Sequence, residues 1–235
     1  MPSIGFSTGA LFKEALAEGV AAAEQMNLDV IELSALRFRE LTSLVDFVAT
    51  HNLAHFTYVS VHAPTDYAPE QEGDIAAALL SIASQWHWPV VVHPDCLSNL
   101  DLWKPFGALL CIENMDKRKP AGRTVEELSA VFEQFQEARL CFDVAHARQI
   151  DSSMTEAYRI LREFSGRICQ VHLSEVTSSS KHERMSDAAV EAYREVAAQL
   201  PAGAPVILET PVRPDEARGE IEQANRVFQA VTIRK

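Results

Sequence analysis

The sequence predicts a single (β/α)8 barrel, and three observations support this prediction. Short strand-like runs alternate with amphipathic helical stretches along the whole 235-residue chain. Most of these runs are dense in Val, Ile, Leu and Cys, as parallel strands covered on both faces must be. Eight strand-helix units would average about 29 residues, which suits a closed barrel better than an open doubly wound sheet. No linker rich in Pro, Gly or Ser interrupts the pattern, so we expect residues 1–235 to form one domain.

The strand candidates are short, rich in aliphatic residues and bounded by helical or turn-forming stretches. In chain order, we expect strands at 3–8, 29–34, 58–63, 89–94, 108–114, 138–145, 167–174 and 204–210. Because helices separate consecutive strands, the connections should be right-handed crossovers and the strands should all run parallel.

The helix candidates carry apolar residues at helical spacing, with polar residues between them. We expect helices at 10–26, 41–50, 70–86, 125–136, 152–164, 187–199 and 214–230. The link after the fourth strand, residues 97–107, is shorter and is expected to hold only a turn or two.

Composition narrows the range of partners and locations. The chain has 21 Lys and Arg against 33 Asp and Glu, a net charge of -12, so we expect no binding to nucleic acid, which requires clustered cations. Neither a signal peptide nor an apolar run of about 18 residues is visible, so we expect a cytoplasmic protein without a membrane span. The four cysteines show no close spacing and should be reduced and mostly buried: Cys96, Cys111, Cys141 and Cys169. A homo-oligomer is compatible with this sequence, which does not define the oligomeric state.

Metal-capable side chains follow six of the predicted strands. They are His62, His93, Glu113, Asp143, His146, His172 and Glu209. In a (β/α)8 barrel, function lies at the carboxyl ends of the strands. A lone histidine or carboxylate there is more often structural, but a set drawn from six strands is hard to explain that way. Several buried carboxylates would repel one another, and a bound divalent cation would remove that cost. The sequence therefore predicts a metal site.

The donor set indicates which metals are suitable. Histidine and carboxylate ligands without cysteine fit borderline or harder cations, of which zinc and manganese are our preferred candidates. Three or four ligands hold one ion, whereas the full set suggests more, with Glu113 as a bridging carboxylate. His182, in the loop sequence SSSKHERMS, is also expected to join the site. We expect about one to three ions.

The ordered set of motifs VHAP, VHPD, IENM, FDVAHA, VHLSE and LETP resembles the xylose isomerase-like barrels, over residues 4–211. This superfamily includes sugar-phosphate isomerases and epimerases and the endonuclease IV type of apurinic-site nucleases. In the epimerase scheme one metal is held by four residues from successive strands, matched here by Glu113, Asp143, His172 and Glu209. The resemblance implies that Glu113 and Glu209 also move the substrate proton.

The endonuclease scheme adds three histidines, which correspond here to His62, His93 and His146. It also uses an Asp-x-His pair after the seventh strand, where this chain has Ser180-Lys181-His182. The missing aspartate weighs against a third metal.

Three functions follow from these residues. Our first expectation is a metal-dependent isomerase or epimerase that transfers a proton next to the carbonyl of a small sugar or sugar phosphate. The alternative is a metal-dependent phosphodiester hydrolase, which the full histidine set favours and the acidity and compact loops oppose. A barrel that binds metal without turnover is a third reading, against which the paired glutamates argue.

Further residues could bind substrate. Basic side chains occur in loops on the functional side, where they could hold a phosphate or carboxylate: Lys117, Arg148, Lys181 and Arg184. Phe12, which follows the first strand, could form a wall of a sugar pocket.

Overall fold

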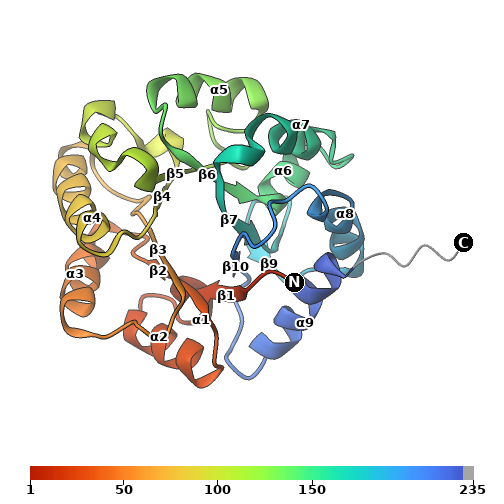
Figure 1. Ribbon diagram of the computed structural model, residues 1–235, viewed down its shortest axis with the longest axis horizontal. Coiled ribbons are helices and arrows are strands. Elements are labelled where there is room, and N and C mark those ends of the chain that lie inside the picture. The colour runs from red at the N-terminus through yellow and green to blue at the C-terminus, as the bar shows by residue number, and fades with distance from the viewer. Residues whose placement is uncertain (230–235) are drawn as a thin grey trace, which may run out of the picture.

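Eight parallel strands form a closed barrel surrounded by helices in the computed structural model, which describes residues 1–229 (Figure 1). The strands follow one another around the barrel in chain order, and the last of them returns to the first. Residue pairs such as Ile4 and Val206 complete the closure, because they lie opposite each other in parallel register. The predicted (β/α)8 barrel is confirmed.

Each predicted strand is present, with ends a few residues shorter than expected. The barrel strands are β1 (Ile4–Ser7), β2 (Val30–Ser34), β3 (Tyr58–His62), β4 (Val90–Val92), β5 (Leu110–Glu113), β6 (Arg139–Asp143), β7 (Ile168–Leu173) and β10 (Val206–Leu208). A short antiparallel pair, β8 (Glu175–Val176) and β9 (His182–Glu183), lies in the loop after β7. This pair carries His182 and was not expected from the sequence.

The helices lie outside the strands and cover their apolar outer faces (Figure 1). They are α1 (Thr8–Leu11), α2 (Leu16–Gln25), α3 (Leu41–Thr50), α4 (Glu72–Trp86), α5 (Val125–Gln134), α6 (Val144–Ile150), α7 (Thr155–Phe164), α8 (Asp187–Ala197) and α9 (Ala217–Phe228). The link after β4 holds only 3₁₀ turns, as expected. The predicted end of the last helix, Ala230, lies outside the described residues. No helix in the described part of the chain is long and apolar enough to cross a membrane.

The first predicted helix is wrong in one respect, because it is broken into α1 and α2. The backbone of Phe12 is extended after α1, and Glu14 adopts a left-handed conformation with φ 61°. The two helices then pack closely, since a Cβ on Gly19 would lie only 2.9 Å from the Cβ of Thr8. Glycine at this position is what permits the approach.

The sixth strand ends earlier than predicted, at Asp143. Its carboxylate accepts a hydrogen bond of 2.7 Å from the backbone N–H of His146 and so caps α6. Residues 144–150 therefore form a helix, and the expected strand over 144–145 is wrong. As a result, His146 lies on the first helical turn, beside the carboxyl ends of the strands.

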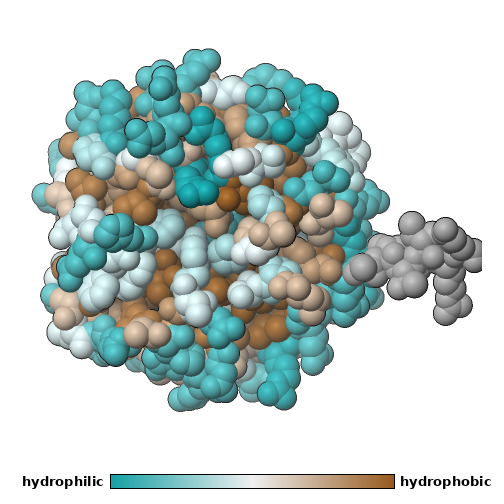
Figure 2. Space-filling model, viewed as in Figure 1, coloured by the Kyte–Doolittle hydropathy of each residue, from teal (hydrophilic) through white to brown (hydrophobic). Residues whose placement is uncertain are grey.

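The interior of the barrel is unusually polar. Fully buried polar side chains point inward from neighbouring strands, and they include Glu32, Ser60, Glu113, Asp143, Gln170 and His172. On the face drawn in Figure 2, hydrophilic residues gather mostly at the rim, over the outer helices, and apolar residues lie nearer the centre. Burying charged groups costs several kcal/mol each unless they are compensated. The buried charged side chains therefore need hydrogen-bond or ionic partners, which are described with the candidate site below.

Two of the cysteines depart from the expectation that all four are reduced. Cys111 on β5 and Cys169 on β7 form a disulfide inside the barrel, whereas Cys96 and Cys141 are free. The two bonded residues are 58 positions apart in the sequence. β5 and β7 lie on either side of β6, so the closed barrel brings the two residues together, and spacing along the chain gives no sign of it.

Candidate metal centre

All eight side chains predicted to bind metal gather at the carboxyl ends of the barrel strands. Six of them line a cavity of about 310 Å³: His62, His93, Glu113, His146, His182 and Glu209. Asp143 and His172 are fully buried beside it. The arrangement follows from the parallel strands, which direct all of their carboxyl ends towards one mouth.

Glu113 lies at the centre of the histidines. Its Oε2 is 3.3 Å from Nε2 of His62 and 3.3 Å from Nε2 of His93. Its Oε1 is 3.2 Å from Nδ1 of His146 and 3.7 Å from Nδ1 of His172. The two carboxylate oxygens thus face different sets of imidazoles, which is the arrangement expected of a bridging ligand.

Two groups of potential ligands share Glu113. In the first, ligand atoms of His62, His93 and Glu113 lie within 4.8 Å of one another. In the second, the same limit includes four side chains: Glu113, Asp143, His172 and Glu209. His146 and His182 lie beside these groups, with rings 5.7 Å apart, but belong to neither.

Several buried atoms at this site have no hydrogen-bond partner among the described residues. They are Nδ1 of His93, Oδ2 of Asp143, Nδ1 of His172 and Oε2 of Glu209. Leaving such atoms unpaired costs about 1–3 kcal/mol each, and a divalent cation would satisfy them together. His62 fits as well, because its Nδ1 lies 2.9 Å from the carbonyl of Ala63, to which it can donate, and its Nε2 faces Glu113, where an ion could take the place of the hydrogen bond between them. The residues present therefore suit a metal ion, although the role of each as a ligand stays a prediction.

A third group of potential ligands, formed by His93, Asp95 and Cys96, is less suitable. The ammonium of Lys119 lies 2.9 Å from Oδ2 of Asp95 and already supplies a positive charge. Burial raises the pKa of the Cys96 thiol to about 11, which keeps it protonated near neutral pH. We assign no metal to this group.

Comparison with solved structures identifies the fold. The structure is similar to a D-tagatose 3-epimerase-like protein, with a TM-score of 0.66 and 19% identity over 96% of this chain and 98% of that one. It is also similar to the 3-keto-D-glucoside 4-epimerase YcjR from E. coli, with a TM-score of 0.62 and 13% identity over 97% and 99% of the two chains. The IOLI protein with a bound zinc atom gives a TM-score of 0.61 and 15% identity, over 96% of each chain.

This chain shares its (β/α)8 barrel fold with these proteins. The sequence matches no protein-family model and no curated protein. Identities of 13–19% establish the fold only, and one fold hosts many reactions. The chemistry of this barrel therefore has to be argued from its own residues.

Burial and close charges shift the pKa values at the centre. Burial alone would raise the pKa of Glu113, but His93 and His172 outweigh it and hold the pKa well below its usual range. Burial alone would lower the pKa of His62, whereas its hydrogen bond with Glu113 and the nearby carboxylates raise it to about 9. The pKa of His146 is likewise lowered by burial but raised overall to about 10, mainly by Asp143 and Glu113. In the metal-free protein, protons on imidazoles thus balance the carboxylates.

The metal-free protein is expected to lose stability as the pH rises from about 6.5 to about 10. The folded-state pKa values of His62 and His146, about 9 and about 10, lie above the ordinary value of 6.5, so the folded state binds these protons more tightly than the unfolded state. The resulting stabilisation is complete below pH 6.5 and disappears as the pH passes the two folded-state values. Thermal unfolding in the presence of a chelator, repeated over this pH range, measures it.

The matched comparison for this prediction is the protein saturated with zinc. An ion replaces the imidazole protons, so the melting temperature of the zinc-loaded protein should vary less with pH over the same range. A metal-free protein whose melting temperature is constant or rises up to pH 10 would contradict the prediction.

Sequence reasoning missed the residues beneath the ligands. Glu32 is fully buried on β2, and its Oε2 lies 3.0 Å from Nε2 of His172. Asn114 joins β5 to β6, because its side chain both accepts from the backbone N–H of Asp143 and donates to its carbonyl, each at 2.8 Å. The only sequence signal for Glu32 is a carboxylate inside the apolar run VIELS. Without knowledge of the side chains that face it, a carboxylate at this position is most simply interpreted as a cap of the next helix.

The basic residues predicted to bind substrate lie away from the cavity wall. Arg148 pairs with Glu175 at 2.7 Å, and Arg184 pairs with Glu216 at 2.8 Å. Lys117 and Lys181 are exposed, and none of the four lines the cavity. Two neighbouring cations, Arg118 and Lys119, line it instead. The side chain of Arg118 is anchored by the buried carboxylate of Asp116 at 2.9 Å and 3.1 Å.

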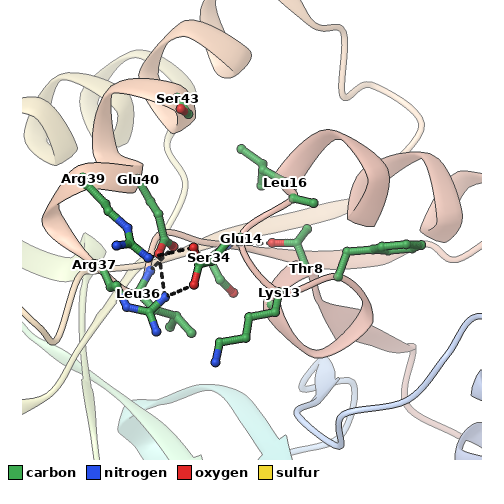
Figure 3. Close-up of a pocket in the computed structure, with 13 residues that line it drawn as sticks. Thr8, Lys13, Glu14, Leu16, Ser34, Leu36, Arg37, Arg39, Glu40 and Ser43 are labelled. Atoms are coloured by element: carbon green, nitrogen blue, oxygen red, sulfur yellow. Dashed lines mark hydrogen bonds and ion pairs between the residues drawn. The ribbon is translucent and has the colours of Figure 1, made fainter.

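Phe12 lines a second cavity, of about 270 Å³, next to the metal cavity (Figure 3). The two cavities share Gly9, Ser34 and Leu36 in their walls. Figure 3 shows Arg37 and Arg39 turned towards Glu14, which lies 2.5 Å from one guanidinium and 2.7 Å from the other. Since these charges are already paired, the second cavity offers a largely neutralised polar wall.

Proposed function

We propose that this protein is a divalent-metal-dependent isomerase or epimerase of a sugar or sugar phosphate. The observation that carries the proposal is the group of Glu113, Asp143, His172 and Glu209, whose ligand atoms lie within 4.8 Å of one another, with both glutamates in the cavity wall. The similar structures add support, because they include a D-tagatose 3-epimerase-like protein, a 3-keto-D-glucoside 4-epimerase and an L-ribulose 3-epimerase.

The chemistry requires a proton to leave a carbon next to a carbonyl and to return. A divalent ion held by these four residues would polarise the carbonyl and make the adjacent C–H more acidic. Glu209 is suited to remove or return that proton, because its side chain is 14% exposed at the cavity and its Oε2 has no hydrogen-bond partner in the described part of the chain. Nearby imidazoles, His172 first, outweigh burial and lower its pKa, so that it is an anionic base near neutral pH.

Glu113 is more firmly held than Glu209. It is 1% exposed, and four imidazoles face its two oxygens. We propose that it orients the centre and serves as the second proton-transfer group on the other side of the substrate carbon. Arg118 and Lys119 lie at the cavity wall, where an anionic group such as a phosphate would share them with their present partners, Asp116 and Asp95.

A phosphodiester hydrolase is the second candidate, and one observation favours it. His62, His93 and Glu113 form a further ligand group that shares Glu113 with the first, as a centre of two ions would require. The net charge of -12 opposes nucleic acid as the substrate. We rank this function below the isomerase.

Solvent exchange distinguishes the two functions. After manganese or zinc is added, we expect the protein to incorporate deuterium from heavy water at the carbon next to the carbonyl of at least one ketose in a panel of free and phosphorylated sugars. Proton NMR of the sugar measures the exchange, and protein treated with a chelator is the control. Elemental analysis of the same sample should give one ion per chain for the isomerase. If the protein instead nicked abasic-site DNA at low salt and exchanged no proton of any sugar, the isomerase proposal would be wrong and the hydrolase would take its place.

The remaining expectations become part of this proposal. We propose that residues 1–235 form one domain that acts on a small molecule in the cytoplasm, with zinc or manganese as its ion. A zinc atom in the similar IOLI structure supports zinc. The disulfide between Cys111 and Cys169 is the observation that opposes a cytoplasmic location, because disulfides persist mainly in oxidising compartments.

A further inference from the structure

We propose that Glu32 is a positioning residue that fixes the tautomer of His172, so that Nδ1 of this imidazole faces the metal centre. The inference rests on the metal site of the proposed function, but it concerns a residue on β2 that contributes to neither of the two ligand groups argued above. The carboxylate of Glu32 is completely buried inside the barrel, and this role would explain why a charged group is kept there.

Glu32 receives several donors at one oxygen. Its Oε2 lies 2.7 Å from Nε2 of Gln170, 3.0 Å from Nε2 of His172 and 3.3 Å from Oγ of Ser60. An oxygen surrounded by donors in this way acts as a charged acceptor, and such hydrogen bonds are stronger than neutral ones. A residue that only filled space inside the barrel would not need them.

Gln170 is held in one orientation by Tyr58. The Tyr58 hydroxyl donates to Oε1 of Gln170 at 2.7 Å, which places the amide nitrogen of Gln170 next to both Glu32 and His172. The contact between Nε2 of Gln170 and Nε2 of His172 is 2.9 Å. The amide could therefore donate either to Glu32 or to the imidazole.

When its imidazole is neutral, as a metal ligand must be, these contacts leave two arrangements for His172. If its Nε2 had no proton, the lone pair would accept from Gln170 and would also face the Glu32 carboxylate at 3.0 Å, which is repulsive. If Nε2 carries the proton, it donates to Glu32, and Gln170 donates to the same carboxylate. The second arrangement satisfies the donors and avoids the repulsion, so Glu32 selects it.

The selection matters at the opposite edge of the ring. A neutral imidazole has one proton, and when Nε2 holds it the lone pair remains on Nδ1. Nδ1 of His172 is the atom that points to the centre, 3.3 Å from Oε2 of Glu209 and 3.7 Å from Oε1 of Glu113. A carboxylate behind a histidine is a common way to orient a metal ligand, and its loss typically costs about 10- to 100-fold in metal affinity.

Zinc binding tests the proposal without reference to turnover. The variant Glu32→Gln is nearly isosteric but uncharged, and we expect its affinity for zinc, measured by competition with a chromogenic chelator, to fall about 10- to 100-fold. Glu191→Gln is the matched control, because it makes the same chemical change at a carboxylate that is 63% exposed and lies outside the cavity; its zinc affinity should equal that of the wild type. Equal affinities for wild type and Glu32→Gln would overturn the proposal.

Histidine ¹⁵N NMR of the zinc-loaded wild type gives a second test that needs no variant. We expect His172, assigned by its absence in His172→Gln, to show a protonated Nε2 and a metal-bound Nδ1; the reverse pattern would overturn the proposal. If both measurements succeed but no sugar is turned over, the positioning role stands and the isomerase proposal fails. If the wild type binds no zinc, the metal centre and the positioning role fail together.

Discussion

Replacing Glu209 with glutamine is expected to lower the turnover number for sugar isomerisation by about 10²- to 10⁴-fold, the usual contribution of a positioned general base. The amide is nearly the same size and keeps an oxygen that can bind a cation, but it cannot accept the substrate proton. Glu209 lines the cavity beside His172, whose Nδ1 lies 3.3 Å away. Steady-state kinetics, deuterium exchange and metal content should be measured on the same preparation.

The control for this experiment is Glu183→Gln. Glu183 lies in β9 on the same side of the barrel, is exposed and does not line the metal cavity. The same chemical change there should leave turnover unchanged. If Glu209→Gln retained wild-type turnover with its metal content intact, Glu209 would not be the proton-transfer group.

Replacing Glu113 with glutamine is expected to destabilise the metal-free protein by about 3–5 kcal/mol, the cost of leaving buried charges without their partner. The imidazoles of His62, His93 and His146 lie 3.2–3.3 Å from the carboxylate oxygens of Glu113. Without that carboxylate, His62 and His146, whose pKa values are raised to about 9 and about 10, must either give up a proton or remain charged and buried without this partner. Urea unfolding near pH 7 in the presence of a chelator measures the difference.

A surface carboxylate gives the comparison for Glu113. Glu191 pairs with Arg194 at 2.8 Å, but its side chain is 63% exposed, so Glu191→Gln should change the free energy of unfolding by less than about 1 kcal/mol. Glu113→Gln should in addition abolish binding at both ligand groups, because they share this residue. A Glu113→Gln protein as stable as Glu191→Gln would show that the histidines are not held by this charge.

The fold could be predicted from the sequence because parallel strands buried on both faces leave a strong local pattern. Runs such as VVVH and ICQVHL are dense in aliphatic residues, and most of the predicted strands are followed by a helix. The positions of the ligands were predictable for a related reason, since the carboxyl ends of all strands meet at one mouth. His62, Glu113 and Glu209 could thus be grouped without any knowledge of distances.

The features that escaped prediction depend on contacts between distant segments. Asp143 looked like part of a longer strand, because its hydrogen bond to the backbone of His146 cannot be read from the apolar run around it. The role of Glu32 depends on its contacts with Gln170 and His172, which are more than a hundred residues away in the chain. That Arg118 lines the cavity whereas the exposed Lys117 does not is equally a matter of local loop conformation.

The pairing of β1 with β10 has a consequence for the newly made chain. Ile4 lies opposite Val206, so β1 can pair with β10 only after almost the entire polypeptide has been made. Contacts between such distant positions form late, because a long loop must close before they are gained. During synthesis, His62, His93 and Glu113 therefore emerge well before Glu209, and the nascent protein holds one ligand group before the other. Completion of the second group coincides with closure of the barrel, so that full metal binding would report that the chain has finished folding.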